Sequence, residues 1–409
     1  MTEPCPAEGG LAEVDLAALD RLATAAETVI ERLRERVFAE GARKRLELRF
    51  QPRAAAAMAG TTVAAIRAAE AAGALPDPAA GQPGGRHPGY DLAAVNAIRA
   101  HFGTLPWRAE SDPPLVMAVQ NFKGGVGKST LVCHLAQYLA LRGYRVCVID
   151  CDSQATTTAV FGLNPDVDVD EERETLYPFF RHGGPASLHY ALRPTHWPGI
   201  ALIAANLGLY DAEYEFAARL AREDGFVLDR LREGIATISD AFDVVLLDPP
   251  PALGMISLSV LRAADALLIP APPSTIDFGS TAHFLRMLAS TLAELARHGG
   301  ERHYRFVRLL ATKLDENKSA HHAIRRMMAH VFAGGLLDAT LKDSAEIDNA
   351  AAALSTVYEV TGPAARTETH RRARAFLDAV GAEVEALIRA TWPASGPAPA
   401  RGEGDDEAP

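Results

Sequence analysis

The fold of this chain is decided by one stretch of sequence, Lys123-Gly124-Gly125-Val126-Gly127-Lys128-Ser129-Thr130. It lies between an apolar run over residues 115–122, which predicts a strand, and a helical pattern over residues 129–141. Glycines allow successive backbone N–H groups to close around a polyphosphate, and the N-terminus of the following helix adds its positive end. Lys128 is then placed to reach the β- and γ-phosphates, and the Ser129 hydroxyl to bind Mg²⁺. The stretch therefore predicts a loop, residues 123–130, that binds a nucleoside triphosphate.

The loop carries a second lysine. Of the 41 basic residues in the chain only six are lysine, and two of these, Lys123 and Lys128, fall in this one loop. Phe122 stands where the general pattern has its first glycine, and Lys123 follows it. Because Lys128 already serves the phosphates within one subunit, a second ammonium is suited to reach a nucleotide in a partner subunit and to neutralise charge that develops during transfer. Lys123 therefore predicts a dimer with nucleotide at its interface.

Two further acidic sites follow predicted strands. Asp248 ends a strand over residues 242–247 and precedes three prolines, so its carboxylate is placed to hold Mg²⁺ through water. Asp152 follows a strand over residues 145–150 and is a candidate to orient the attacking water beside the metal. Asp150, at the end of that strand, is expected to satisfy backbone groups. For Asp152 the alternative is a simple turn-capping aspartate.

Beyond residue 113, predicted strands and helices alternate. Further apolar runs predict strands over residues 200–204, 266–270 and 306–311, and the pattern over residues 366–392 predicts a closing helix. Such alternation implies parallel strands in a sheet that is covered on both faces. We therefore expect an α/β domain over residues 107–393, built on a doubly wound, mostly parallel sheet.

An amphipathic helix is predicted within residues 1–45. Its apolar residues recur at helical spacing at Leu19, Leu22, Val29, Leu33 and Val37. Such a helix either packs on its own domain or serves as a short dimerising helix, and fewer than four clean heptads leave both interpretations open.

Residues 46–106 predict a helix-turn-helix region. A short helix over residues 54–59, a glycine at 60 and a second helix over residues 61–72 form the usual arrangement of this motif. In a DNA-binding interpretation the contacts are Thr61, Thr62 and Arg67 in the groove and Arg86 in a wing. A helical hairpin without a DNA-binding role has the same pattern.

Composition limits the class of protein. The chain has 409 residues, 48% apolar and 23% charged, which is ordinary for globular domains and excludes disorder throughout. No apolar run approaches the roughly 18 residues of a spanning helix and residues 1–10 lack signal-peptide features, so a cytoplasmic protein is expected. The net charge of −11 argues against a uniformly basic surface, so any DNA contact has to come from local patches. The Pro-, Gly- and acid-rich segment 394–409 is expected to be disordered.

Three stretches together resemble the deviant-Walker ATPases of the ParA and MinD superfamily: residues 123–130, 150–154 and 242–250. Their order and spacing match over residues 113–392. Within that superfamily the resemblance is to the longer plasmid partition ATPases, including the RepA proteins of repABC plasmids, through residues 85–90 and 341–360. One departure is Ser153, where the family usually has proline.

The resemblance implies a role in trans for Lys123, phosphate binding for Lys128, Mg²⁺ binding for Ser129, water positioning for Asp152 and the Walker B role for Asp248. It favours ATP with Mg²⁺ as cofactors. It also implies a homodimer that binds DNA without reading sequence, associates with the nucleoid, and hydrolyses ATP faster with a centromere-binding partner of the ParB or RepB type. The helix-turn-helix region is then expected to repress its own operon by binding operator DNA.

The candidates for non-specific DNA contact are two arginine clusters, Arg325 with Arg326, and Arg371 with Arg372 and Arg374 near the closing helix. A solvated surface face is the alternative for each cluster. Two other functions stay open. One is a transcriptional repressor that uses the loop only to sense ATP. The other is a MinD-like ATPase that cycles on a membrane, which calls for a basic amphipathic helix at the C-terminus. Because residues 403–407 are mostly acidic, no membrane contact is expected.

Overall fold

The computed structural model describes residues 16–37, 44–78, 87–222, 225–297 and 303–394. By its internal contacts the chain divides into two compact units, residues 1–43 and 44–409. The first unit contains helix α1 (Leu16–Val37), where the sequence predicts an amphipathic helix. Whether α1 packs on its own domain or pairs with a second copy stays a prediction. Arg86 and residues 395–409 of the segment predicted to be disordered lie outside the described residues.

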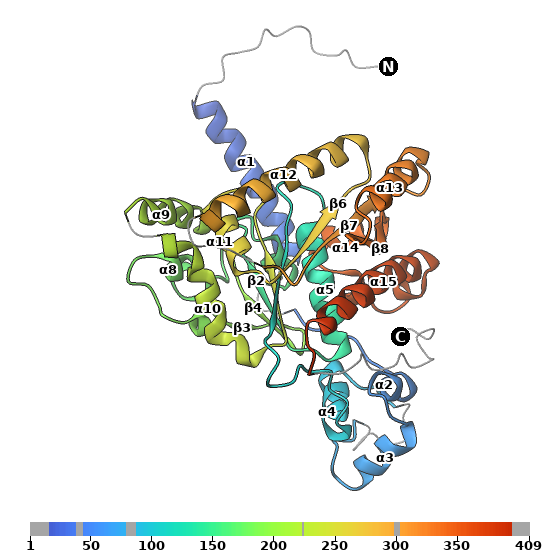
Figure 1. Ribbon diagram of the computed structural model, residues 1–409. Coiled ribbons are helices and arrows are strands. Elements are labelled where there is room, and N and C mark those ends of the chain that lie inside the picture. The colour runs from blue at the N-terminus through green and yellow to red at the C-terminus, as the bar shows by residue number, and fades with distance from the viewer. Residues whose placement is uncertain (1–15, 38–43, 79–86, 223–224, 298–302, 395–409) are drawn as a thin grey trace, which may run out of the picture. The chain divides into compact units, whose positions relative to one another are not determined.

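The second unit is built on an eight-stranded sheet with the order β3-β4-β2-β5-β1-β6-β7-β8 (Figure 1). The strands are β1 (Leu115–Val119), β2 (Val146–Asp150), β3 (Arg193–Pro194), β4 (Ile200–Ile203), β5 (Val244–Asp248), β6 (Ala266–Ala271), β7 (Phe306–Leu314) and β8 (Leu336–Lys342). All neighbours pair in parallel except β3 and β4. The predicted doubly wound, mostly parallel sheet is thereby confirmed.

The strands differ from the sequence prediction in several places, among them β1, β7 and β8. β1 ends at Val119 rather than at residue 122, because the Asn121 side chain leaves the ladder and donates to Pro270 O at 2.8 Å. β7 continues to Leu314, three residues beyond its predicted end. β8 was not predicted: it lies at the edge of the sheet and only two of its seven residues are buried, so its sequence lacks a continuous apolar run.

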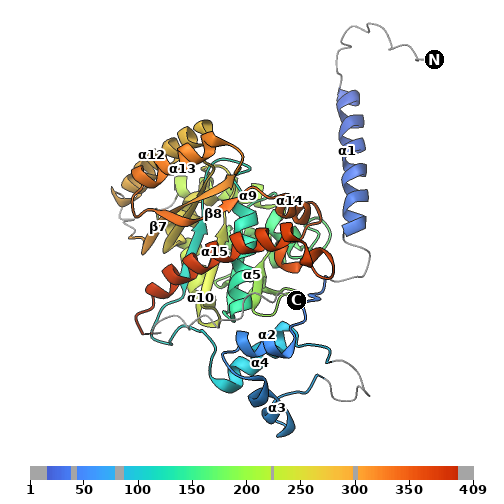
Figure 2. The same cartoon turned by 90° about the vertical axis from the view of Figure 1, so that its right-hand side faces the viewer.

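Helices cover both faces of the sheet, as Figures 1 and 2 show. The described α-helices of the second unit are α2 (Pro52–Met58), α3 (Val63–Ala71), α4 (Leu92–Phe102), α5 (Lys128–Arg142), α6 (Thr156–Val160), α7 (Glu171–Glu174), α8 (Tyr177–Phe180), α9 (Leu209–Arg222), α10 (Arg230–Ile238), α11 (Met255–Ala263), α12 (Thr275–Arg297), α13 (Ser319–Val331), α14 (Ala345–Ala352) and α15 (Glu368–Ala390). Alternate residues of β1 face opposite sides: Met117 joins the core under α5 and α15, and Ala118 the core under α9 to α12.

The predicted helix-turn-helix region packs against the end of α5 that lies away from the glycine loop (Figure 2). Arg99 of α4 is 2% exposed, and it donates from Nε to Met58 O at 3.1 Å and from its Nη2 to Leu141 O at 2.7 Å. One guanidinium thus ties together α2, α4 and the last turn of α5. The Trp107 indole adds a bond to Gly143 O at 3.0 Å, just beyond α5.

A buried carboxylate, Asp243, joins the starts of β2 and β5. It is fully buried and accepts bonds from the Arg145 guanidinium at 2.7 Å, the Arg145 backbone N–H at 2.8 Å and the Arg108 backbone N–H at 3.2 Å. Removing one partner of such a pair leaves the other charge without compensation. Loss of either partner is therefore expected to destabilise this end of the sheet.

We expect Asp243→Ala to lower the free energy of unfolding by about 3 kcal/mol, at the low end for a broken buried pair because the Arg145 side chain is 29% exposed. Urea unfolding measures this change. Glu294→Ala is the control, because it breaks an exposed pair of α12 with Arg297 and should cost less than about 1 kcal/mol. Equal losses in the two variants would contradict the assignment.

Candidate nucleotide site and DNA-contacting surfaces

The glycine loop connects the buried strand β1 to α5, as predicted, and its backbone takes conformations that favour glycine. Gly125 has a φ of 73° and Gly127, the N-cap of α5, has a φ of 94°. At Gly124, Gly125 and Gly127 an added Cβ would meet no other heavy atom within 4 Å, so the space over the loop is open. Thr312 of β7 donates to Val126 O at 3.1 Å and fixes the loop from the side of the sheet. The loop thus places backbone N–H groups at a helix N-terminus beside open space, where an anion can be bound.

Lys128 lies against this loop. Its side chain is largely buried, and its Nζ donates to Lys123 O at 3.3 Å. Burial lowers the pKa of Lys128, while the nearby carboxylates of Asp248 and Asp152 act in the opposite direction. The structure therefore brings Lys128, Asp152 and Asp248 together at the carboxyl ends of β1, β2 and β5, where the sequence placed them.

Asp248 ends β5 and is fully buried next to the first turn of α5. Its Oδ2 accepts a bond from Thr157 Oγ1 at 2.7 Å, and its Oδ1 is buried without a hydrogen-bond partner among the described residues. Burial raises the pKa of Asp248, and the Thr157 and Ser129 hydroxyls counteract that rise. A buried carboxylate oxygen that lacks a partner and lies beside a serine at the loop suits a water-bound divalent cation.

The neighbouring acids form the turn after β2. Asp150 pairs with Asp248 in the register of β2 and β5, and its Oδ2 accepts bonds from Thr158 N at 2.9 Å and Thr158 Oγ1 at 2.7 Å. Burial and the charge of Asp248 raise the pKa of Asp150. Asp150 thus satisfies local groups, as expected. Asp152 Oδ1 accepts from Gln154 N at 3.0 Å, so the turn-capping contact considered as its alternative is present.

Lys123 has a partner that the sequence analysis missed. Its Nζ forms an ion pair with Asp277 in the first turn of α12, and the Ser274 hydroxyl donates to the same carboxylate. Burial acts to raise the pKa of Asp277, but the bonds from Lys123 and Ser274 outweigh it and the pKa is lowered. A signal was available, because Ser274 and Asp277 have the spacing of a capping box. The pairing with a lysine 154 positions earlier carries no local signal.

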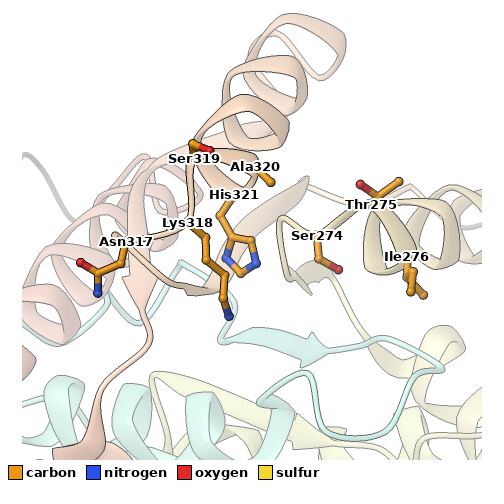
Figure 3. A pocket seen from close by; sticks show the side chains of 8 residues that line it. All are labelled: Ser274, Thr275, Ile276, Asn317, Lys318, Ser319, Ala320 and His321. Carbon is orange, nitrogen blue, oxygen red and sulfur yellow. The ribbon is translucent and has the colours of Figure 1, made fainter.

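A pocket of about 490 Å³ adjoins this ion pair. It lies between the N-terminal ends of α12 and α13 and is lined by residues 274–276 and 317–321 (Figure 3). His321 contributes to the electrostatic field at Asp277 and lies beside the pocket with Ser274, while Ile276 is 79% exposed. The surface that presents Lys123 is therefore open and partly apolar.

The candidate DNA-contacting residues lie in two separate places. In the region predicted as helix-turn-helix, α2 and α3 are present; Thr62 is the N-cap of α3, accepting from Ala65 N at 3.1 Å, and Arg67 is exposed. Thr61 is half-buried in the turn. On α13, Arg326 is exposed. Arg325 instead donates to Leu337 O at 3.0 Å and to other groups of β8.

Comparison with known proteins gives the family. A family model described as an AAA domain matches residues 115–296. A Rhizobium rhizogenes protein named Putative replication protein A is 33% identical over 322 residues, 76% of this chain and 79% of that protein. Protein SopA of Escherichia coli K12 is 32% identical over 358 residues, 85% of this chain and 91% of SopA. Chromosome partitioning protein ParA of Caulobacter vibrioides is 33% identical over 162 residues, 39% of this chain and 57% of that protein. The chain belongs to the ParA-type family of partition ATPases.

The likeness to ParA-type proteins extends beyond the nucleotide domain. The SopA match covers too much of the chain to be confined to residues 115–296. A solved structure named Partition Protein superimposes with a TM-score of 0.63 at 21% identity, over 91% of this chain and 98% of that chain, which shows a shared fold. In the described part of this ParA-type chain, none of the helices is long and apolar enough to cross a membrane.

Proposed function

We propose that this chain is a DNA-segregation ATPase that binds ATP and Mg²⁺ between two subunits, grips DNA while ATP is bound, and releases it after hydrolysis. The observation that carries the proposal is the convergence of Lys123, Lys128 and Asp248 at one glycine loop in a ParA-type chain. Ordinary phosphate-binding loops need only one lysine. The second lysine has its use between subunits.

Each residue of the site has a distinct task in this proposal. The backbone N–H groups of residues 124–130 and the Lys128 ammonium bind the phosphates. Ser129 and, through water, Asp248 hold Mg²⁺, which neutralises charge on the phosphate oxygens when bound. Asp152 orients the attacking water and contributes to the metal site. Because the Lys123 ammonium pairs with Asp277 of its own subunit, it has to leave that carboxylate to reach a nucleotide across the dimer.

A centromere-binding partner of the ParB or RepB type accelerates hydrolysis in this proposal and so reopens the dimer on the nucleoid. The direct test is ATP hydrolysis by the purified protein alone, with DNA, and with DNA plus the partner encoded beside it. We expect slow turnover alone and faster turnover with both. A chain that binds ATP without turning it over under any of these conditions is instead the ATP-sensing repressor.

Non-specific DNA binding rests on Arg326 rather than on Arg325. The Arg325 guanidinium is occupied by three groups of β8, whereas Arg326 is exposed and forms no ion pair within the described ranges. We expect Arg326→Ala to weaken ATP-dependent binding to a random duplex and to reduce the slope of log K against log salt by about 1. Arg325→Ala should leave that slope unchanged. Fluorescence anisotropy across a salt series measures both, and an unchanged slope in Arg326→Ala would overturn the assignment.

Operator binding is assigned to α2 and α3. Thr61, Thr62 and Arg67 are the expected contacts in the groove, and Arg86 the expected wing contact. The α2–α3 pair, with Arg67 exposed on α3, supports this role. A footprint on the DNA upstream of its gene tests it. Footprinting that persists after deletion of residues 1–106 would remove this part of the proposal.

A further inference from the structure

The carboxylate of Glu359 collects donors from distant parts of the chain. Its side chain is 7% exposed. Burial by itself would raise the pKa of this carboxyl, but its hydrogen bond to His196 and the charge of Lys44 hold the pKa at about 2. The donors are Lys44 Nζ at 2.6 Å, His196 Nε2 at 2.7 Å, Trp197 Nε1 at 2.7 Å, Gln137 Nε2 at 3.2 Å and Ser355 Oγ. We call Glu359 and these five residues the Glu359 cluster.

Lys44 is the N-terminal entry to this cluster and the first residue of the second unit. Besides Glu359, its ammonium donates to Val160 O at 2.9 Å and Leu354 O at 3.0 Å. Three acceptors match the three donors of an ammonium group. A Cβ at Gly162 would come within 2.7 Å of Lys44 Cβ, so glycine lets the lysine lie close to the end of α6. Both the aliphatic part and the ammonium group of the Lys44 side chain are therefore fixed in position.

Helix α6 connects Lys44 to the nucleotide site. Near its beginning, Thr157 donates to Asp248 Oδ2 at 2.7 Å and Thr158 donates to Asp150. At its last residue, Val160 O accepts from Lys44. The five residues of this helix thus separate the candidate metal-binding carboxylate from Lys44. A displacement of the Thr157 end moves the Val160 end, because a single hydrogen-bonded turn has little internal freedom.

Helix α5 makes a second connection from the nucleotide site. It begins at Lys128, and about two and a half turns later Gln137 donates to Glu359. On the same helix, His134 Nε2 accepts from Val357 N at 3.2 Å, two residues before Glu359. Two helices that begin at the nucleotide site therefore both contact the Glu359 cluster.

Residues 44–50 lead from the cluster to the helix-turn-helix region. Leu48 and Phe50 are each 3% exposed and belong to the core shared with α5. Phe50 exchanges two backbone hydrogen bonds with Tyr90, at 2.7 and 2.8 Å, immediately before α2. A shift of Lys44 is consequently passed to a segment that is anchored by the buried Leu48 and Phe50 and hydrogen-bonded to Tyr90 at its far end.

We propose that Lys44, held by the Glu359 cluster, couples nucleotide binding to the helix-turn-helix region. The inference rests on the proposed function, since it assumes that ATP and Mg²⁺ bind at the glycine loop. A cation held through water at Oδ1 of Asp248 places its charge next to the same carboxylate whose Oδ2 accepts the bond from Thr157. The position of α6 then depends on occupancy, Lys44 follows Val160, and residues 44–50 take a different arrangement in each state.

Hydrogen exchange of the full chain tests this, with and without a non-hydrolysable ATP analogue and Mg²⁺. In the wild type we expect slower exchange in residues 123–131 and a change of about fivefold or more in residues 44–58. Lys44→Met keeps the aliphatic stem and removes the ammonium, so it should retain the first effect and lose the second. Lys342→Met is the matched control, because Lys342 pairs with Glu316 at the same 2.6 Å on the surface, and it should behave as wild type.

The readouts distinguish a failure of the coupling through Lys44 from a failure of the proposed function. Nucleotide protection of residues 123–131 without any change in 44–58 of the wild type overturns the coupling and leaves the proposed function intact. Absence of protection in 123–131 overturns both. A full response of residues 44–58 in Lys44→Met also overturns the coupling. Lys44→Arg, which keeps the positive charge, is the second variant if Lys44→Met unfolds. It should retain part of the nucleotide-dependent change of exchange in residues 44–58. Any effect of nucleotide on the affinity of the wild type for promoter DNA should weaken in the same variant.

Discussion

Lys123→Ala is expected to reduce ATP turnover by about 10³-fold or more and to leave ATP binding close to that of the wild type. In a single subunit the Lys123 ammonium pairs with Asp277 on α12 and takes no part in the inner surface of the loop. Its removal therefore deletes the ion pair with Asp277 and the contact proposed across the dimer, and leaves the Lys128 side of the loop unchanged. A cation supplied in trans to the transferring phosphoryl group is worth about 10³ to 10⁵ in rate. Single-turnover hydrolysis and equilibrium binding of a fluorescent ATP analogue measure the two quantities separately.

Lys128→Ala is the comparison variant for this experiment. Its Nζ lies over the loop at 3.3 Å from Lys123 O, next to Asp248 and Asp152. Its loss should lower ATP affinity as well as turnover, because we propose that this ammonium binds the phosphates within the subunit. If Lys123→Ala lost ATP affinity to the same degree as Lys128→Ala, the two lysines would share one task and the role in trans would be wrong.

Asp248→Asn is expected to reduce Mg²⁺-dependent turnover by about 10²-fold or more. An asparagine has the same shape and can still accept the bond from Thr157 Oγ1, so the fold around β5 should survive. It lacks the charge that holds a divalent cation through water, and metal-assisted stabilisation of a phosphoryl group is worth several kcal/mol. Turnover measured against Mg²⁺ concentration, with thermal unfolding beside it, gives the result.

Asp240→Asn is a suitable control for Asp248→Asn. Asp240 is exposed in the short helical turn before β5, so the same change of charge occurs outside the site. It should leave turnover and its Mg²⁺ dependence unchanged. An Asp248→Asn protein that is folded and retains wild-type turnover would remove Asp248 from the metal site.

Much of the nucleotide site was predictable because its signals are local. Residues 123–130 combine glycines, the start of a helix and two lysines in one short continuous stretch of sequence. Asp248 was predictable from its position at the end of an apolar strand, since the carboxyl ends of parallel strands meet at one edge of the sheet. Edge strand β8 was not, because a half-buried strand without an apolar run has no clear period.

Arg325 and Arg326 show the limit of sequence for surface residues. They are adjacent and chemically identical, yet one is occupied by groups of β8 and the other is exposed. The difference follows from the helical rotation of about 100° between neighbouring positions on α13 and from the presence of β8 on one side only. Neither fact can be read from the residue type.

The sequence by itself determined the glycine loop, its two lysines and the parallel sheet that carries them, because each depends on neighbours a few positions away. Tertiary structure alone decided which distant side chains form ion pairs and hydrogen bonds with the residues of the loop and of the helix that follows it. Asp277 meets Lys123 across 154 positions, and Gln137 meets Glu359 across 222. Such pairs form only when packing of the sheet and helices brings distant segments together, since a charge or a hydrogen-bond donor leaves no trace of its partner in the sequence around it.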